Sequence, residues 1–276
     1  MRNIMSMALT VSILTTAALT PPLLMMGTIE VLADDMMRHV DLQSDEFTKS
    51  EMSRADIEAM IAKAKPGETV DLSSKSLNGL DLSGMDLRRV NLQSARINNA
   101  NLSGANLEGV VLDQAWMLKS NLTGANLKKA SLFGTQLLNA KMDNVDLSDA
   151  LIAADMSRAS LKNAIFDGAN LSAGENQSMG LMRGNLMSAD LRGASFKGAN
   201  MWRSAAEYAD MRGADFTNTN LVKAELGGAN LEGAIVTGAD FEKADVNSTT
   251  LTKLVDAAHA KNLKKATNYS RAILDK

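Results

Sequence analysis

The sequence predicts an elongated solenoid that is closed by short helices at both ends, and three observations support this. From Leu72 onward, almost every fifth residue is Leu, Ile, Met or Phe. The residue two places earlier is usually Ala, as in Ala125-Asn126-Leu127. The segments on either side of this stretch follow helical spacing instead. A five-residue unit cannot bury its own apolar side chain, so successive units must stack on one another.

The overall composition limits the class of protein. The chain has 276 residues, is 45% hydrophobic and carries a formal net charge of -3. This hydrophobic content argues against global disorder, and near charge balance without a basic block does not indicate a general nucleic-acid binder. The chain has no cysteine, which excludes disulfides, thiolate metal sites and lipid attachment through cysteine.

Residues 1–33 have the parts of a secretory signal peptide. Arg2 precedes an apolar stretch over residues 4–26, and small residues precede a cleavage site between Ala33 and Asp34. Cleavage there predicts a periplasmic or secreted protein. An uncleaved membrane anchor is the alternative, because about 20 apolar residues can span a bilayer. The prolines at 21 and 22 favour cleavage.

The next segments are expected to be a linker over residues 34–49 and an N-terminal capping helix over residues 50–66. Ser53 and Asp56 have capping-box spacing, and an apolar stripe begins at Ile57. Pro66 ends the helix. Because the helix directly precedes the first repeat, we expect it to cover the open end of the solenoid.

The repeats are expected over residues 70–252, with one slip in phase. Inward positions run at intervals of five to Ile152, and resume one residue early at Met156. The missing residue is expected to distort the local coil. Continuing this phase places Asn176 inward, but a buried amide without partners is costly, so Asn176 and the surrounding residues 172–180 are expected to form an outward loop or bulge, and the conformation of residues 172–183 is left open.

Residues 253–276 lose the five-residue period. Apolar residues recur at helical spacing from Leu254 and again from Leu263, with charged residues between them. This pattern predicts a C-terminal cap made of one or two short helices.

Units such as Ala105-Asn-Leu-Glu-Gly109 and Ala229-Asn-Leu-Glu-Gly233 resemble those of the pentapeptide-repeat family over about two-thirds of the chain. The resemblance implies an all-β solenoid, a right-handed quadrilateral β-helix in which four pentads complete one coil. About 37 pentads would give about nine coils, roughly 44 Å long at about 4.8 Å per coil. The resemblance also leaves open a homodimer formed through the C-terminal cap.

The sequence offers little catalytic chemistry. His39 and His259 have no obvious partners, and no nucleophile-elbow, phosphate-loop or calcium-loop motif occurs. We therefore expect a protein that is not an enzyme and has neither a metal site nor a cofactor.

Two pairs of carboxylates have the spacing of one coil, which would place them about 5 Å apart. Asp190 would lie beside Asp210, and Glu225 beside Asp245. Such pairs could share a proton or bind a cation. The simpler reading is that they are solvated chance pairs, because Asn or Asp is common at this position of the repeat.

Three aromatic residues are candidate contacts for a partner. Trp116 and Trp202 each lie next to an inward position, so both are expected to face outward, and Tyr208 lies near the second. Exposed aromatics at otherwise polar positions are plausible anchors for a protein. Isolated surface aromatics without a function are the alternative.

These features favour a non-enzymatic scaffold or protein-binding rod in the cell envelope, with an unknown protein partner. Nucleic acid is not expected to bind, and membrane contact is expected only if residues 1–33 remain attached. The alternative is a DNA mimic that inhibits or protects a type II topoisomerase, as in some members of the family. It would need a strongly negative surface and a cytoplasmic location. An enzyme is disfavoured because a flat solenoid face lacks an enclosed pocket.

Overall fold

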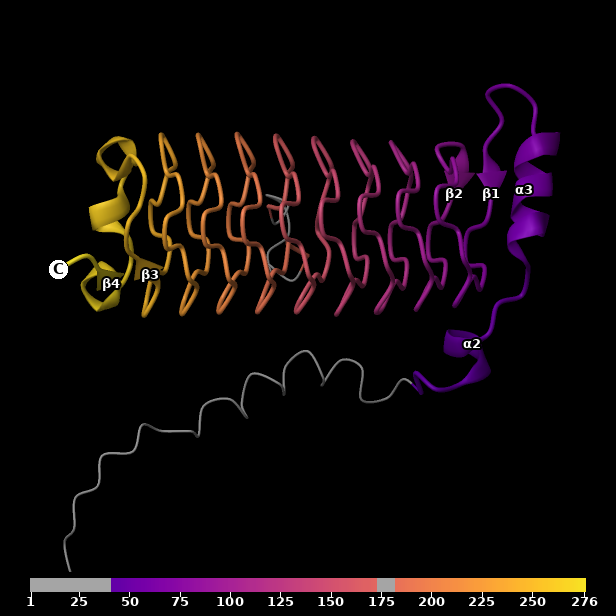
Figure 1. Cartoon of the computed structure of the whole chain (residues 1–276), viewed down its shortest axis with the longest axis horizontal. Coiled ribbons are helices and arrows are strands. Elements are labelled where there is room, and N and C mark those ends of the chain that lie inside the picture. Colours follow the sequence, from indigo (N-terminus) through magenta and orange to yellow (C-terminus); the bar gives the residue numbers. More distant parts are fainter. Residues whose placement is uncertain (1–40, 173–181) are drawn as a thin grey trace, which may run out of the picture. The chain divides into compact units, whose positions relative to one another are not determined.

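The computed structural model describes residues 41–172 and 182–276. Short parallel bridges join residues that are 20 apart, as between Asp81 and Asn101 and between Asn101 and Asn121. Each coil is therefore made of four five-residue sides. Figure 1 shows these coils stacked side by side, with the helix α3 (Arg54–Lys63) at the N-terminal end of the stack.

Every side of the solenoid repeats one hydrogen-bond pattern. The Leu102 amide donates to the Asn121 carbonyl of the next coil at 2.7 Å, and the Asn121 amide donates back to Ala100 at 2.9 Å. The Ala105 amide closes the corner on the Leu102 carbonyl at 3.0 Å. The second residue of the corner has a positive φ, which is +63° at Gly104. Glycine takes this conformation without steric strain, so it recurs there.

The core is a column of side chains along the axis of the solenoid. Central leucines and the alanines two places before them are fully buried, as at Leu127 and Ala125. One column contains stacked phenyl rings, with centroids 4.7 Å apart between Phe166 and Phe196 and 5.2 Å apart between Phe196 and Phe216. Apolar burial between successive coils supplies the main driving force for stacking.

Two of the four faces carry the residues that matter below. Each face is a column of bridge-forming residues. The first face includes Ser76, Arg96, Trp116, Gln136, Asp155, Asn185, Ala205, Glu225 and Asp245. The fourth face includes Val111, Ser131, Leu151, Asn170, Asn200, Asn220 and Asp240. The corner at which the chain passes from the fourth face to the first is named the 4/1 corner.

The register of the coils changes twice. Gln136 pairs with Asp155, 19 residues further on, so the predicted loss of one residue is confirmed. It falls at the 4/1 corner around Ala153, where the chain makes no regular turn. Asp155 then pairs with Asn185, 30 residues further on.

The spacing of 30 corrects the sequence-based count of pentads. Ten more residues than usual separate these two neighbouring rungs, so this part of the chain adds two pentads fewer to the stack than the sequence phase predicts. The prediction about the conformation of Asn176 itself lies outside the described residues.

From residue 41 to the first repeat, the structure contains two helices. The helix α2 (Asp45–Thr48) lies within the segment that was expected to be a linker. The helix α3 begins with the predicted capping box, in which Ser53 and Asp56 exchange hydrogen bonds. Its Ile57 is fully buried in the same apolar cluster as the first inward leucines. The strands β1 (Val70–Asp71) and β2 (Val90–Asn91) then pair in parallel.

The C-terminal segment differs from the predicted cap. It contains three short 3-10 helices, η1 (Ala257–His259), η2 (Leu263–Lys265) and η3 (Tyr269–Arg271), rather than one or two helices beyond the rod. The strand β3 (Thr250–Leu251) pairs in parallel with β4 (Ile273–Leu274). The 3-10 helices therefore widen the corners of one further coil. Within the described ranges, none of the helices has the length and apolar character needed to cross a membrane.

Candidate partner-binding surfaces

Trp116 is covered by the N-terminal segment. The ring of Phe47, from α2, packs edge-on against the indole, with the ring centroids 5.1 Å apart. Next to this contact, Glu46 forms an ion pair with Arg96 at 3.2 Å. Trp116 thus lies outside the apolar core, in line with the expected outward orientation, but the chain itself supplies an aromatic partner for it.

Trp202 and Tyr208 lie at different corners. Trp202 is at the 4/1 corner, where Arg203 and Lys223 lie 5.2 and 5.7 Å from the centre of its ring. Tyr208 follows the first face, is 53% exposed and lies over Gly228. The side chains therefore flank the first face rather than forming one aromatic site.

The predicted pairing of Asp190 with Asp210 is present, and both carboxylates are held by arginines. Arg192 donates two hydrogen bonds of 2.8 Å to Asp190, and Arg212 donates bonds of 2.8 and 2.6 Å to Asp210. These bonds are the main reason that the pKa of each carboxyl is lowered. Because both pKa values are lowered, Asp190 and Asp210 are each ionised and paired with an arginine, rather than sharing one proton.

Glu225 and Asp245 also pair across neighbouring coils, but their carboxylates bind different partners. Arg183 binds Glu225 through two hydrogen bonds of 2.7 and 2.6 Å. Asp245 accepts a hydrogen bond from the side chain of Asn268 at 2.8 Å. This separation disfavours a joint role in binding a cation.

A cluster formed by Arg183, Glu207 and Glu225 was not predicted. Ala205 occupies a bridge position with a minimal side chain, and Arg183 also donates to the neighbouring Arg203 carbonyl at 2.9 Å. Burial opposes ionisation of Glu225, but Arg183 holds the pKa of that carboxyl below its ordinary value. Among the described residues, Glu207 Oε2 is buried without a hydrogen-bond partner.

Burial, and to a smaller extent the charge of Glu225, raises the pKa of Glu207 to about 7. The folded state therefore binds a proton more readily than the unfolded state between pH 4.5 and 7. Stability from this group is complete below its ordinary value of 4.5 and is lost as the pH rises through 7.

We expect Glu207→Gln to raise the free energy of unfolding at pH 8 by about 1–2 kcal/mol and to change it little at pH 5. The neutral amide imitates the protonated carboxyl and removes the charge next to Glu225. Urea denaturation at the two pH values measures this difference. Glu108→Gln, at the same position of the five-residue unit but at another corner, is the control and should show no such dependence. Equal effects of Glu207→Gln at both pH values would contradict the prediction.

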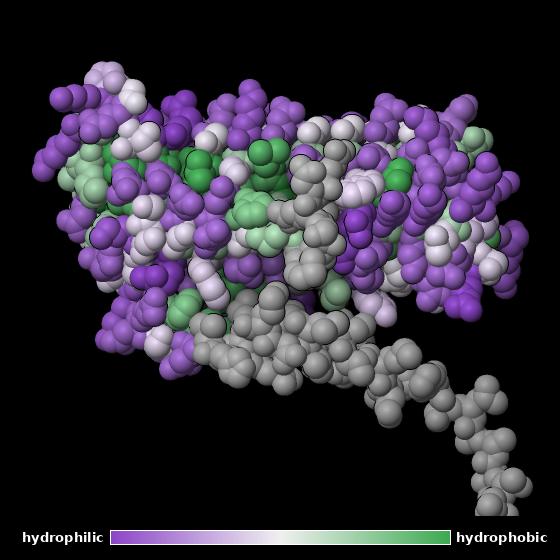
Figure 2. Space-filling model, turned by 180° about the vertical axis from the view of Figure 1, so that it is seen from behind, coloured by the Kyte–Doolittle hydropathy of each residue, from purple (hydrophilic) through white to green (hydrophobic). Residues whose placement is uncertain are grey.

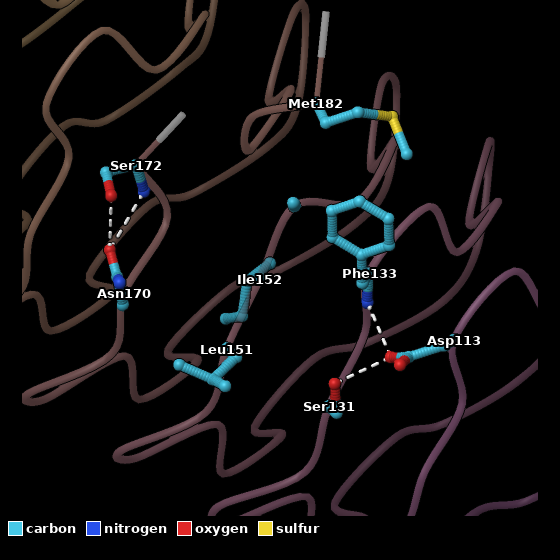
Figure 3. Close-up of a pocket in the computed structure, with 9 residues that line it drawn as sticks. Asp113, Ser131, Phe133, Leu151, Ile152, Asn170, Ser172 and Met182 are labelled. Carbon is cyan, nitrogen blue, oxygen red and sulfur yellow. Dashed lines mark hydrogen bonds between the residues drawn. The ribbon is translucent and has the colours of Figure 1, made fainter. Parts of the chain in front are cut away.

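An apolar groove lies along the 4/1 corner and has a volume of about 370 Å³. Figure 3 shows Phe133, Leu151, Ile152 and Met182 around it, and Asp113 accepting hydrogen bonds from Ser131 and the Phe133 amide. Leu151 is 56% exposed and Phe133 is 37% exposed.

The shortened coil explains why a groove forms there. The rung spacing of 19 removes one corner residue, and Ala153 supplies only a methyl group beside the ring of Phe133. Hydrophilic residues predominate on the side of the molecule seen in Figure 2, and the hydrophobic ones gather in limited patches. The groove was not predicted, because the deletion alone does not show which side chains border it.

A four-sided β-helix built from five-residue sides belongs to the solenoid class of repeat proteins. A family model described as pentapeptide repeats matches the chain in 8 copies, over residues 70–116, 119–149, 150–173, 185–221 and 209–247. The chain therefore belongs to the pentapeptide-repeat family, and its solenoid is a right-handed β-helix.

Three solved structures illustrate this similarity. HetL of the cyanobacterium Nostoc sp. strain PCC 7120, a pentapeptide repeat protein involved in heterocyst differentiation regulation, is 24% identical, with 80% of this chain and 94% of HetL covered and a TM-score of 0.41. QnrB1, a plasmid-mediated fluoroquinolone resistance protein, is 15% identical, with 76% and 93% covered and a TM-score of 0.40. A pentapeptide repeat protein of the Arabidopsis thaliana thylakoid lumen is 26% identical, with 52% and 69% covered and a TM-score of 0.27. No curated protein matches the sequence significantly.

Proposed function

We propose that this chain is a non-enzymatic rod of the cell envelope that binds a protein partner along its 4/1 corner. The observation that carries the proposal is the apolar groove. Corners elsewhere carry mainly Ser, Thr, Asn, Asp, Gly and charged residues, whereas this corner exposes Phe133 next to Leu151 of the adjoining fourth face. Exposed apolar patches with a polar rim are typical of protein interaction sites.

The state of the carboxylates supports a binding role. Asp190 and Asp210 are ionised and held by arginines, so they have neither the proton of a general acid nor the freedom of a general base. Among the described residues that line the groove, Asp113 is the one acidic group, and its Oδ1 already accepts hydrogen bonds from Ser131 and Phe133. An apolar side chain of a partner fits these surroundings better than a polar substrate does.

Photocrosslinking from two positions in cells tests the binding role. We expect a photoreactive residue at Leu151 to give one discrete crosslinked protein, and the same residue at Thr123, an exposed position of another corner, to give none. Phe133→Ser should remove the crosslink from position 151. Identical products from positions 151 and 123 would contradict the groove as a binding site.

Once a partner is known, we expect Leu151→Asn to weaken its binding about tenfold, because apolar anchors contribute most of the binding free energy at protein interfaces. Stability should change by less than about 0.5 kcal/mol, since the side chain is largely exposed. Titration calorimetry and urea denaturation measure the two effects. Thr123→Asn is the matched control.

The location in the envelope rests on residues 1–33, which lie outside the described part of the chain. Mass spectrometry of the N-terminus in separated cell fractions tests it. A periplasmic or secreted species that begins at Asp34 is the expected result. An intact N-terminus in the membrane fraction would mean an anchor, and an intact N-terminus in the cytoplasm would overturn export.

The alternative of a DNA mimic fits the charge distribution less well. Basic side chains alternate with acidic ones along the solenoid, as in the ion pairs Lys128–Asp146 at 3.1 Å and Lys197–Asp215 at 3.2 Å. A duplex presents a continuous line of negative phosphates. We therefore expect gyrase supercoiling and its inhibition by quinolones to be unchanged by this protein, and protection of gyrase would favour the alternative.

A further inference from the structure

Exposed cations line the C-terminal half of the 4/1 corner, and we name this set the basic edge. It consists of Arg203, Lys223, Lys243, Lys264 and Lys265. The first three occupy the same turn position of successive coils, with φ of +57°, +58° and +57°. The amide of Arg203 donates to the Val222 carbonyl at 3.1 Å, and that of Lys223 to the Glu242 carbonyl at 2.9 Å, which fixes the coils beside one another.

The last two lysines continue this line. They lie in η2, between Lys261, which pairs with Asp240, and Thr267, whose amide donates to the Ala244 carbonyl at 2.8 Å. The segment that holds η2 therefore replaces the corner of Lys243 in the final coil. Cations occur at this corner in four consecutive coils.

These charges are weakly neutralised. Among the ion pairs of the described residues, one involves the basic edge, between Lys243 and Glu242 at 3.5 Å. The nearby carboxylate of Glu225 is already bound by Arg183. The charges of Asp190 and Asp210 on another face are instead matched by arginines, so the basic edge is a local exception in a chain of net charge -3.

Two apolar side chains lie beside the first two cations of the basic edge. Trp202 and Val222 precede Arg203 and Lys223 in the chain, and both side chains are partly exposed, whereas the exposed Glu242 precedes Lys243. A partner lying along the corner would thus meet a row of positive charges next to two apolar side chains and one carboxylate. This combination favours an amphipathic partner over a uniformly charged polymer.

The spacing of the cations along the solenoid is close to the rise of one turn of an α-helix. Coils of the solenoid repeat every ~4.8 Å, and one turn of an α-helix rises ~5.4 Å. A helix parallel to the edge can therefore place one carboxylate near each of Arg203, Lys223 and Lys243. An extended strand repeats its side chains on one face every ~6.6 Å, which fits less well.

We propose that the basic edge binds an amphipathic α-helix of a protein partner that carries one acidic residue per turn. This inference rests on the proposed protein-binding function and names the chemistry of the partner. Trp202 and Val222 contact the apolar side of that helix. The edge continues from the apolar groove, because Ser172 of the groove and Trp202 occupy this corner in adjacent coils.

A synthetic helical peptide of about 18 residues, roughly 27 Å long, is the probe. It carries Glu once per turn with Leu beside each Glu, and a shuffled peptide of the same composition is its control. Titration calorimetry against the mature chain is expected to show the periodic peptide binding about tenfold more tightly than the shuffled one.

Substitutions test whether the cations of the basic edge bind the periodic peptide. We expect the double substitution Lys223→Gln and Lys243→Gln to weaken binding of the periodic peptide about tenfold, through lost charge complementarity. Lys129→Gln is the matched control, since Lys129 is exposed, has a φ of +58° and occupies the same turn position at another corner. It should leave binding unchanged.

Equal affinity of the two peptides would overturn the inference, as would an equal loss of peptide affinity from the double substitution and from Lys129→Gln. Tighter binding of single-stranded DNA, or of vesicles with anionic lipids, than of the periodic peptide would also overturn it. Crosslinking from Leu151 does not depend on the basic edge. Failure of the peptide experiment alone would therefore leave the proposed protein-binding function intact, whereas failure of both experiments would contradict it.

Discussion

Phe196→Ala is expected to lower the free energy of unfolding by about 3–5 kcal/mol. The ring is fully buried and stacks on Phe166 on one side and on Phe216 on the other. Removing it opens a cavity that faces two neighbouring coils, so both interfaces of one repeat lose contacts. Urea denaturation followed by circular dichroism measures the loss.

Phe196→Leu is the control for this prediction, because Leu is the commonest residue at inward positions. It preserves most of the apolar volume and should cost about 1–1.5 kcal/mol. Similar losses for the two variants would show that ring stacking, rather than volume, determines stability here. A loss below about 1 kcal/mol for Phe196→Ala would contradict the expected cavity.

Ile57→Asp is expected to detach α3 from the first coil and to lower the free energy of unfolding by at least about 3 kcal/mol. Ile57 is fully buried against the apolar end of the solenoid, where a carboxylate has no compensating partner. Once α3 is detached, the first coil exposes its apolar side chains and also its unpaired backbone groups. We therefore expect self-association, measured by light scattering after size-exclusion chromatography.

Met60→Asp separates this effect from a general loss of helix stability. Met60 lies on the same helix and is 38% exposed, so the same charge is added where water can solvate it. It should leave the protein monomeric and change stability by less than about 1 kcal/mol. Monomeric Ile57→Asp protein of unchanged stability would show that α3 does not cover the end of the solenoid.

The repeat was predictable because each five-residue side is specified locally. An inward Leu, a small residue two places earlier and a corner residue that tolerates positive φ recur in each unit, as in Ala125, Leu127 and Lys129. The capping box at Ser53 was predictable for the same reason. The stacking of Asp190 on Asp210 followed from the 20-residue coil, but their arginine partners did not, because outward side chains do not follow the repeat.

The long rung spacing from Asp155 to Asn185 was not predicted, for a numerical reason. It adds ten residues to the coil, which equals two pentads, so Leu186 stays in phase with Leu171. The five-residue period of the sequence is therefore unbroken here, although the number of stacked rungs is smaller than the period predicts. The cluster of Arg183 and Glu225 was missed for the same reason, since it forms only when the chain returns at this point.

The contact between Phe47 and Trp116 was also beyond sequence reasoning. The acidic segment around Phe47 has no apolar periodicity, and a helix as short as α2 leaves no clear pattern. The prediction of an outward Trp116 was sound in geometry. The segment that covers it could be identified only from the structure.

The long rung spacing between Asp155 and Asn185 affects how readily insertions and deletions are tolerated at this point of the chain. Lengthening the connection between equivalent rungs from 20 to 30 residues adds only about 0.4 kcal/mol of closure entropy, because this term grows with the logarithm of length. Insertions at this corner are thus nearly neutral for folding, provided that the chain returns in phase. Selection can therefore lengthen, shorten or exchange the segment without rebuilding the scaffold, and this site is the natural place to graft a foreign peptide.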